Sequence, residues 1–292
     1  MSNLEISNTS LDRPDWDIVI RPSDKWINLP IKDVWEYRDL MWLFVRRDFV
    51  AQYKQTVLGP AWHFIQPVLT TAMFLMVFNK IARIPTDGIA PGGFYMAGLT
   101  IWSYFSNALT STSNTFVHNA SIFGKVYFPR LVLPISVVIS SVVKFGIQFL
   151  LLLVLLAYYH FNGYPVHLGP QLLAIPFLLV QMAALSLGLG IIISSATTKY
   201  RDFSVLLGFA VQLLMYATPV VYPLSYVQEK SFKWLVMANP LTSVVESFRW
   251  AIFGIGTVDL LSIMYSIGFT IITLVVGVLL FNRVEKTFMD TV

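Results

Sequence analysis

The sequence predicts an all-α polytopic membrane protein, and three observations support this fold class. Hydrophobic residues make up 56% of the 292 residues and charged residues only 12%, whereas a soluble domain is typically about 25% charged. Apolar runs recur along the chain, and each is long enough to cross a hydrocarbon core of about 30 Å. Basic residues gather in alternate segments between these runs. We expect six transmembrane helices, an N-terminal amphipathic interfacial helix, and a re-entrant external helical hairpin before the last span.

The N-terminal part is predicted to lie outside the hydrocarbon. Residues 1–30 form a polar arm that lacks the basic start and apolar centre of a cleavable signal peptide. Residues 31–58 predict a cytoplasmic interfacial helix, with apolar and aromatic side chains opposite one charged sector. At about 100° per residue, that sector is about 100° wide and holds the following residues: Glu36, Asp39, Arg46, Arg47 and Lys54. This pattern is typical of a helix on a membrane surface; the alternative is a packing helix of a soluble protein.

Residues 60–292 are predicted to form one six-span transmembrane domain. We place the spans at 60–82, 94–116, 131–160, 170–196, 204–222 and 260–281. If the N-terminus is cytoplasmic, the cytoplasmic segments hold fourteen Lys and Arg residues and the external segments hold five. The positive-inside rule therefore places both termini in the cytoplasm.

The last external segment, residues 223–259, contains two apolar stretches too short to span a membrane, 234–238 and 244–254. Asn239 and Pro240 separate them, and this pair is typical of a break between helices. The segment therefore predicts a helical hairpin that enters the outer leaflet and returns.

Two strings in the chain carry a resemblance to a known family. RRDFVAQYKQTVLGPAWHFIQPVL begins at Arg46, and NPLTSVVESFRW begins at Asn239, before the last span. They resemble the membrane subunits of type-2 ABC exporters, and most closely the permeases for lipid-linked polysaccharides such as O-antigen, capsule and teichoic acid. The resemblance implies a homodimer in the plasma (bacterial inner) membrane, bound to two copies of an ABC ATPase subunit.

The same resemblance implies which residues couple the chain to its ATPase. In such permeases the interfacial helix and the first cytoplasmic loop contact the ATPase, and residues 197–203 would be a lesser contact. The coupling residues carried over are Arg46, Arg47, Lys54, Phe123, Lys125, Tyr127 and Arg130. Because the sequence has no G-x-x-x-x-G-K-[ST] loop, ATP and Mg are expected on the partner ATPase. Without Cys or a His pair at metal-ligand spacing, neither a metal site nor another cofactor is expected, and no nucleic-acid partner is expected.

The second predicted span is unusually polar, and we expect it to line the substrate pathway. Hydroxyls and amides recur every three or four residues, and aromatic residues accompany them. Such side chains can bind sugar hydroxyls and stack on sugar rings; the alternative is hydrogen bonding between helices. The predicted pathway residues are Trp62, Trp102, Tyr104, Phe105, Asn107, Ser111 and Asn114. Trp62 is equally well explained as an interfacial anchor.

Two further features of the spans have structural and functional interpretations. Lys144 lies near the middle of the third span, where a charge needs a partner or a wet cavity. Glu246 is a possible partner; the alternative is a lysine that extends to the interface from a shifted span. Ser186, Gly190 and Ser194 form a small-residue face that predicts close helix packing.

The leading functional hypothesis is the channel-forming subunit of an ATP-driven exporter of lipid-linked, O-antigen-like polysaccharide. It is a transport subunit rather than an enzyme. One alternative is a related exporter of teichoic acid, capsule or small hydrophobic compounds. The other is a membrane enzyme such as a sugar transferase. That enzyme would need catalytic carboxylates at the membrane surface, and acidic residues are few in the predicted cytoplasmic loops and C-terminal tail.

Overall fold

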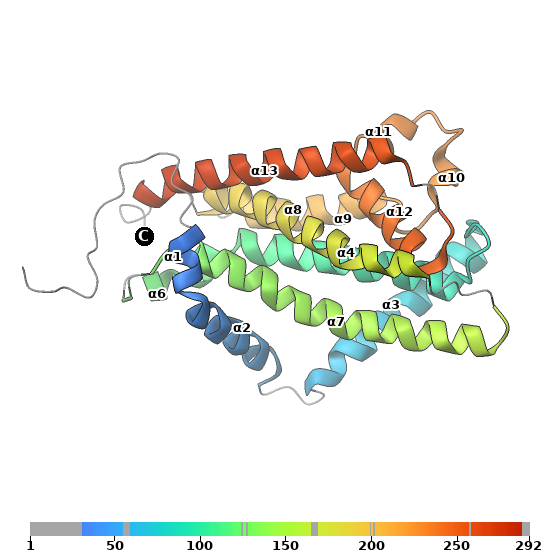
Figure 1. Ribbon diagram of the computed structural model, residues 1–292, viewed down its shortest axis with the longest axis horizontal. Helices are drawn as coiled ribbons and strands as arrows, with labels where there is room; N and C mark the ends of the chain where they lie inside the picture. Colours follow the sequence, from blue (N-terminus) through green and yellow to red (C-terminus); the bar gives the residue numbers. More distant parts are fainter. Residues whose placement is uncertain are drawn as a thin grey trace, which may run out of the picture.

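The computed structural model describes residues 31–54, 59–123, 125–126, 128–164, 169–198, 200, 202–256 and 258–287, and the regular structure of these residues is entirely helical. The long helices lie side by side along one axis, and the short helices gather at the two ends (Figure 1). The all-helical part of the predicted fold class is therefore confirmed.

Five long helical segments form the body of the molecule. They are α3 (Trp62–Phe74), which continues as the π-helical η2 (Leu75–Ile81), α4 (Pro91–Ser113), α7 (Val132–Phe161), α8 (Ala174–Thr197) after the 3₁₀ turn η3 (Pro170–Leu173), and α13 (Leu260–Thr287). Four of them are long and apolar enough to cross a membrane: 62–81, 132–161, 170–197 and 260–283. The chain is thus a multi-pass membrane protein.

The other two predicted spans differ from these four. Helix α4 has 23 residues, enough to cross, but its Ser, Thr and Asn residues lower its mean hydropathy. Helix α9 (Asp202–Tyr216) is apolar but has only 15 residues, or about 22 Å at a rise of 1.5 Å per residue. It ends before Pro219, which cannot donate a helical hydrogen bond. A count of six spans stays a prediction.

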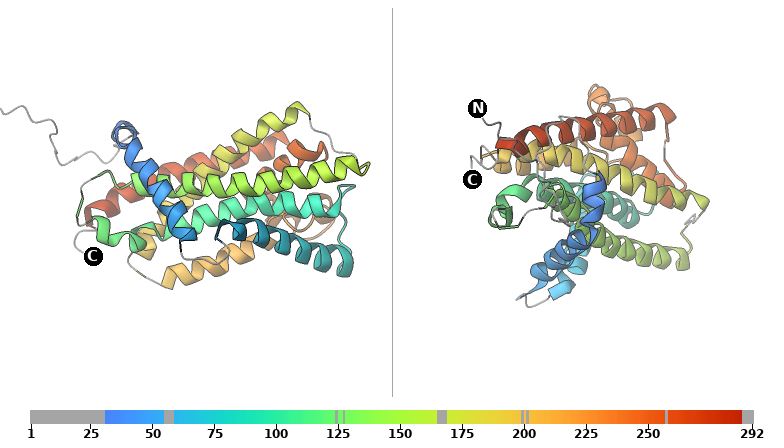
Figure 2. Two further views of the ribbon diagram at one scale, coloured as in Figure 1. Left: turned by 90° about the horizontal axis from the view of Figure 1, so that it is seen from below. Right: turned by 60° about the vertical axis from the view of Figure 1, so that its left-hand side comes forward.

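The short helices divide the molecule into two ends (Figures 1 and 2). The first, called the α2 end here, holds α1 (Ile31–Glu36), α2 (Arg38–Tyr53), η1 (Gly59–Ala61), α5 (Thr115–His118) and α6 (Ala120–Phe123). The other, called the α12 end, holds α10 (Leu224–Val227), α11 (Lys233–Met237) and α12 (Pro240–Phe253). The sequence assigned these same two groups to opposite sides of the membrane.

Helix α2 packs against α7 with one apolar face. Met41, Phe44 and Val45 are buried there, and all three belong to the predicted apolar side. Trp42 also belongs to that side but is exposed, together with Leu43. The helix is therefore apolar on more than the face that it buries, as expected for a helix in contact with lipid headgroups or with another protein.

Helix α12 begins and ends where its sequence dictates. The Asn239 side chain accepts a hydrogen bond from the Leu241 N–H at 3.0 Å, and Pro240 occupies the first turn, where a missing N–H is tolerated. Gly254 ends the helix with φ 68°, a conformation that favours glycine. The predicted break at Asn239–Pro240 is confirmed, whereas penetration of the outer leaflet stays a prediction.

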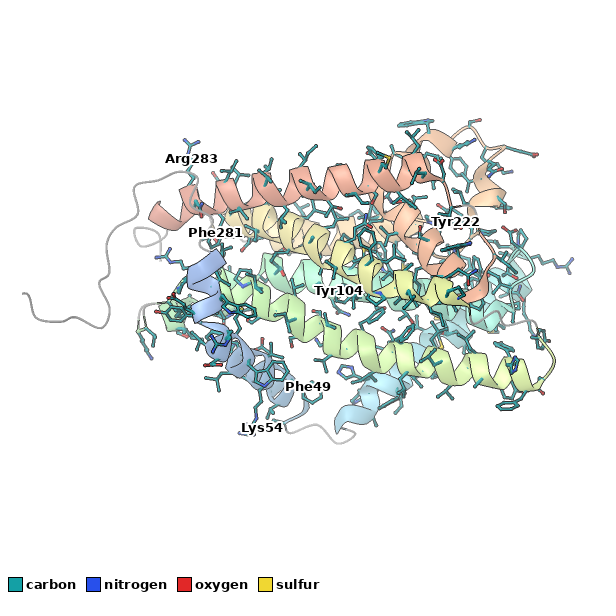
Figure 3. The ribbon with its side chains drawn as sticks, viewed as in Figure 1. Phe49, Lys54, Tyr104, Tyr222, Phe281 and Arg283 are labelled. Atoms are coloured by element: carbon teal, nitrogen blue, oxygen red, sulfur yellow. The ribbon has the colours of Figure 1, made fainter. Side chains whose placement is uncertain are left out.

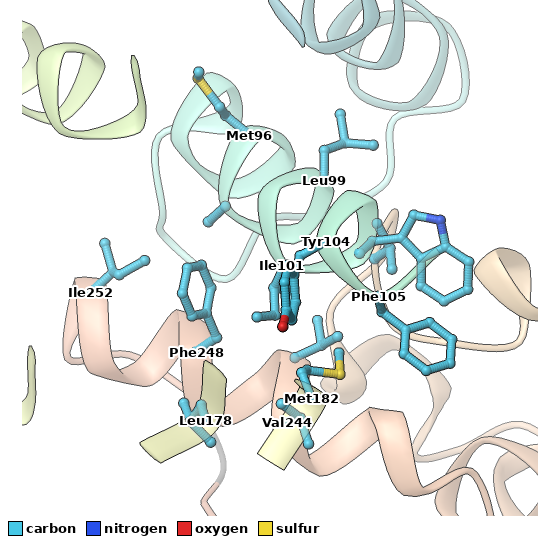
Figure 4. Close-up of a cluster of buried hydrophobic side chains, with 14 of the residues drawn as sticks. Met96, Leu99, Ile101, Tyr104, Phe105, Leu178, Met182, Val244, Phe248 and Ile252 are labelled. Carbon is cyan, nitrogen blue, oxygen red and sulfur yellow. The ribbon is translucent and has the colours of Figure 1, made fainter. Parts of the chain in front are cut away.

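The main hydrophobic core lies between α4, α7, α8 and α12. Figure 4 shows Ile101, Tyr104 and Phe105 of α4 among side chains from α8 and α12. Tyr104 and Phe105 are 2% and 0% exposed. A helix enclosed by its neighbours in this way needs less apolar surface than a helix that faces lipid, which explains the polarity of α4.

Glycines allow α8 to approach its neighbours closely. A Cβ at Gly188 would lie 2.9 Å from the Leu274 backbone, and one at Gly277 would lie 2.7 Å from the Gly188 carbonyl oxygen. A Cβ at Gly190 would lie 2.6 Å from the Thr112 side chain of α4. The packing interpretation of the small residues on α8 is therefore confirmed at Gly190.

Candidate functional site

The polar face of α4 lines two neighbouring cavities. The first, called the α3 cavity, lies between α3, α4 and α7 and has a volume of about 320 Å³. Its polar lining includes Trp62, Gln66, Thr70, Ser103, Asn107 and Gln148. One aromatic ring among amides and hydroxyls is the chemistry that binds sugars, because the ring stacks and the polar groups exchange hydrogen bonds.

The second cavity, called the α2 cavity, lies between α2, α4, α5 and α7 and has a volume of about 510 Å³. Its polar lining includes Arg47, Thr110, Ser111, Asn114, Asn119 and Ser140. It also holds the ion pair of Arg47 and Asp48. Each cavity has one histidine, His63 in the α3 cavity and His118 in the α2 cavity. Lys144 lines both cavities and so marks the place where they meet.

Arg47 joins α2 to the segment that follows α4. Its guanidinium donates to the Asp48 carboxylate at 2.8 and 2.9 Å and to the Asn119 side-chain oxygen at 3.1 Å. It also lies 4.8 Å from the centre of the Phe44 ring. The two elements that the resemblance assigns to ATPase contact are thus bonded to each other, with the α2 cavity between them.

The structure divides the predicted pathway residues between the two cavities and the hydrophobic core. Trp62 and Asn107 line the α3 cavity, and Ser111 and Asn114 line the α2 cavity. Trp102, Tyr104 and Phe105 instead lie in the hydrophobic core, at most 5% exposed, and line neither cavity. At about 100° per residue, Trp102 and Phe105 lie about 100° and 160° from Ser103, on sides of α4 that pack on other helices. Tyr104 packs on the Phe145 ring of α7, with 5.7 Å between the ring centres.

The predicted coupling residues also differ in their surroundings. Arg46, Lys54 and Lys125 are exposed, and Arg130 is half-buried. Figure 3 shows Lys54 beyond the last turn of α2, pointing away from the long helices. The Phe123 side chain and Tyr127 lie outside the described residues.

The structure does not support the proposed pairing of Lys144 with Glu246. Arg249 donates to the Glu246 carboxylate at 3.1 Å and to the Val220 carbonyl at 2.6 Å, and its guanidinium stacks 3.7 Å from the Phe94 ring centre. Arg249 and Glu246 are 1% and 5% exposed. Glu246 therefore already has a cation at the α12 end.

Sequence reasoning singled out Lys144 on α7, as a lysine that needs a partner or a wet cavity, but missed the polar residues around it on the same helix. Ser140, Ser141, Lys144 and Gln148 line the cavities from that helix. Their spacing of three and four residues places them on one helical face, so the same periodicity argument that was applied to α4 could have found them. In the part of the chain that the structure describes, no three His, Asp or Glu side chains gather as a metal site.

These features define a class: a helical multi-pass membrane protein with polar cavities between its helices, an arrangement suited to moving a polar solute. The model of the ABC-2 type transporter family matches residues 39–253, and the chain belongs to this family. It is a membrane transport subunit, and the resemblance seen in the sequence is confirmed.

Individual relatives agree with the family match. The O-antigen export system permease protein RfbA of Klebsiella pneumoniae is 29% identical over 254 residues, 86% of this chain and 94% of its own. The RfbA protein of Myxococcus xanthus is 30% identical over 222 residues, 75% of this chain and 82% of its own. The polysialic acid transport protein KpsM of Escherichia coli is 23% identical over 248 residues, 84% of this chain and 93% of its own.

Proposed function

We propose that this chain is the membrane-spanning, channel-forming subunit of an ATP-driven exporter of lipid-linked, O-antigen-like polysaccharide. The observation that carries the proposal is the α3 cavity, where the Trp62 ring lies among amides and hydroxyls inside an apolar helical body. The relatives named for O-antigen export align with most of the chain, which supports this substrate class.

The working assembly is a homodimer of six-span subunits with two ATPase subunits, in the bacterial inner membrane with both termini in the cytoplasm. In this orientation the α2 end faces the ATPase, which binds ATP and Mg. The exposed Arg46, Lys54 and Lys125 form the contact surface, and α4 supplies its polar face to the channel.

Coupling then follows from the bonds around Arg47. When the ATPase closes on ATP, it pushes on α2 and on the segment after α4. Because Arg47 bonds to Asn119, the two elements move together, and because α2 packs on α7, the motion reaches both cavities. The helices separate along the polar face of α4, and the glycan enters there.

The cavities also weigh against the alternative functions. An exporter of small hydrophobic compounds needs an apolar pocket, whereas amides and hydroxyls line these two cavities. A sugar transferase needs free carboxylates, and among the described residues the one carboxylate lining these cavities, Asp48, is bonded to Arg47. An exporter of capsule or teichoic acid stays the nearest alternative, supported by the relative named for polysialic acid transport.

Deletion of the chain in its native host tests the proposal. We expect lipid-linked glycan to accumulate inside the cell and to disappear from the surface, and plasmid-borne wild type to restore it. Surface staining with a glycan-specific antibody and extraction of the lipid-linked intermediate measure both pools. Unchanged surface glycan in the deletion strain would refute the proposal.

A further inference from the structure

Lys144 is a half-buried lysine that lines both cavities. It lies near the middle of the 30-residue α7, where an ammonium group is costly unless it meets an anion or water. Within the described residues no acidic side chain lies within ion-pair distance of it. Glu246 is held by Arg249.

The α2 cavity places hydrogen-bond donors beside this lysine. Thr110, Ser111 and Ser140 line it, and none of the three hydroxyls bonds to another group in the described part of the chain. The neighbouring Thr115 and Ser141 hydroxyls, in contrast, donate to backbone carbonyls. Three hydroxyls are thus available to a ligand next to the charge.

The charges that face this cavity sum to an excess of positive charge. Arg47 and Asp48 face it from α2 and neutralise each other at 2.8 Å. His118 faces it from α5, and Lys144 from α7. The net charge of these groups is +1 with His118 neutral, and it is located at Lys144. A cavity with one lysine and several hydroxyls is suited to a phosphoryl oxygen, for which lysine acts as a point charge.

We infer that Lys144 binds the phosphate or diphosphate group of a lipid-linked substrate in the α2 cavity. This inference rests on the proposed function and adds a second subsite to it. Because Lys144 also lines the α3 cavity, a sugar attached to that phosphate extends directly toward Trp62. The two cavities then divide the substrate, with the anionic linker on one side of Lys144 and the glycan on the other.

Binding of farnesyl diphosphate, a glycan-free lipid diphosphate, tests the inference on the full chain in phosphatidylcholine nanodiscs. Loss of a charge-assisted hydrogen bond weakens binding about tenfold or more, so we expect that loss in Lys144→Gln. Lys144→Arg, which keeps the charge, should bind as the wild type does. Lys80→Gln is the matched control, because Lys80 is exposed and lines neither cavity. Farnesol, which lacks the phosphates, should not bind.

Three results would overturn the inference. One is undiminished binding of farnesyl diphosphate to Lys144→Gln. Another is displacement of the probe by phosphatidylglycerol, which would assign the site to membrane lipid headgroups. The third is equally tight binding of inorganic diphosphate, which would assign it to a free anion.

A protection experiment avoids dependence on the Lys144 variants. The chain has no cysteine, so Ser111→Cys introduces a single thiol in the α2 cavity. Farnesyl diphosphate should slow its reaction with a maleimide and leave the exposed control Ser231→Cys unaffected; equal rates with and without the probe would contradict the inference. Failure of the proposed function would appear separately, as normal surface glycan in the deletion strain, whatever the binding result.

Discussion

Two cations that lie among the helices, the buried Arg249 and the half-buried Lys144, occupy opposite kinds of surroundings. Arg249 lies at the α12 end, bonded to Glu246 and Val220 and stacked on Phe94. Lys144 lies between two polar cavities and has no carboxylate partner among the described residues. A charge whose interactions are satisfied by its own chain stabilises the fold, whereas a charge left to face a cavity is available to a ligand.

Helix α4 separates these two regions. One side of it packs into the core against α8 and α12 (Figure 4). The other side carries the hydroxyls and amides of the cavities. The comparison predicts that substitutions on the core side change stability, and that substitutions on the cavity side change transport.

The largest expected loss of stability follows from substitution of Arg249. Arg249→Leu leaves the Glu246 carboxylate buried without its cation, which destabilises a protein by about 3–5 kcal/mol. Thermal unfolding of the purified chain in detergent measures the loss, and Lys144→Gln measured in parallel should change the melting temperature little. Equal destabilisation by the two variants would remove the distinction between the two cations.

A smaller loss is expected at the contact between α8 and α13. Gly277→Ala places a methyl group 2.7 Å from the Gly188 carbonyl oxygen, and overpacking of this kind costs about 1–3 kcal/mol. Gly268→Ala on the same helix is the control, because its Cβ meets nothing within 4 Å. It should be neutral or stabilising by up to about 1 kcal/mol, since alanine favours helix. Comparison of the two melting temperatures tests whether the approach of α13 depends on glycine.

On the cavity side, transport should change without loss of stability. Replacing Asn107 and Ser111 with Leu removes polar groups from both cavities, and two neutral hydrogen bonds correspond to about a tenfold loss of glycan export. Both residues are exposed to the cavities rather than packed, so melting and ATPase activity should hold. If melting falls and export per folded molecule is intact, the polar face serves helix packing instead.

Coupling of the chain to its ATPase should depend on the neighbouring residues Arg46 and Arg47 in different ways. Arg46 is exposed, so Arg46→Glu should weaken binding of the ATPase and change stability by no more than about 0.5 kcal/mol. Arg47→Glu should weaken ATPase binding and also lower the melting temperature, because it breaks the bonds to Asp48 and Asn119. Co-purification with the ATPase, together with melting of each variant, separates the two roles. Normal co-purification and export in the double variant would refute the assignment of α2 to the ATPase contact.

The sequence predicted the long helices well because apolar length alone decides them. The bounds of α7 and α8 differ from the predicted spans by one residue or a few at each end. The break at Asn239–Pro240 was also predictable, because Asn caps the helix and Pro fits its first turn. Local chemistry determined all of these features.

The site was less predictable, because it depends on which helix faces which. The hydroxyl and amide positions of α4 were found by their spacing, but the aromatic residues Trp102 and Phe105 were grouped with them although they face other helices. The partner of Glu246 could not be chosen from the sequence either, since Arg249 at i+3 and Lys144 on another helix were both possible. Only packing in three dimensions decides such pairings.

Single cysteine substitutions at the surface test which end of the molecule faces the cytoplasm, and they should change stability least of all the variants. The chain has no native cysteine, so single substitutions at the exposed Lys125 and Lys230 report the α2 end and the α12 end, respectively. Surface substitutions of this kind change stability by no more than about 0.5 kcal/mol. In intact cells, or spheroplasts if there is an outer membrane, Lys230→Cys should react with an impermeant maleimide and Lys125→Cys should not. After the membrane is permeabilised, both should react. Reversed labelling would place the α2 end outside the cell, beyond the reach of a cytoplasmic ATPase, and the proposed coupling through Arg47 would fail with it.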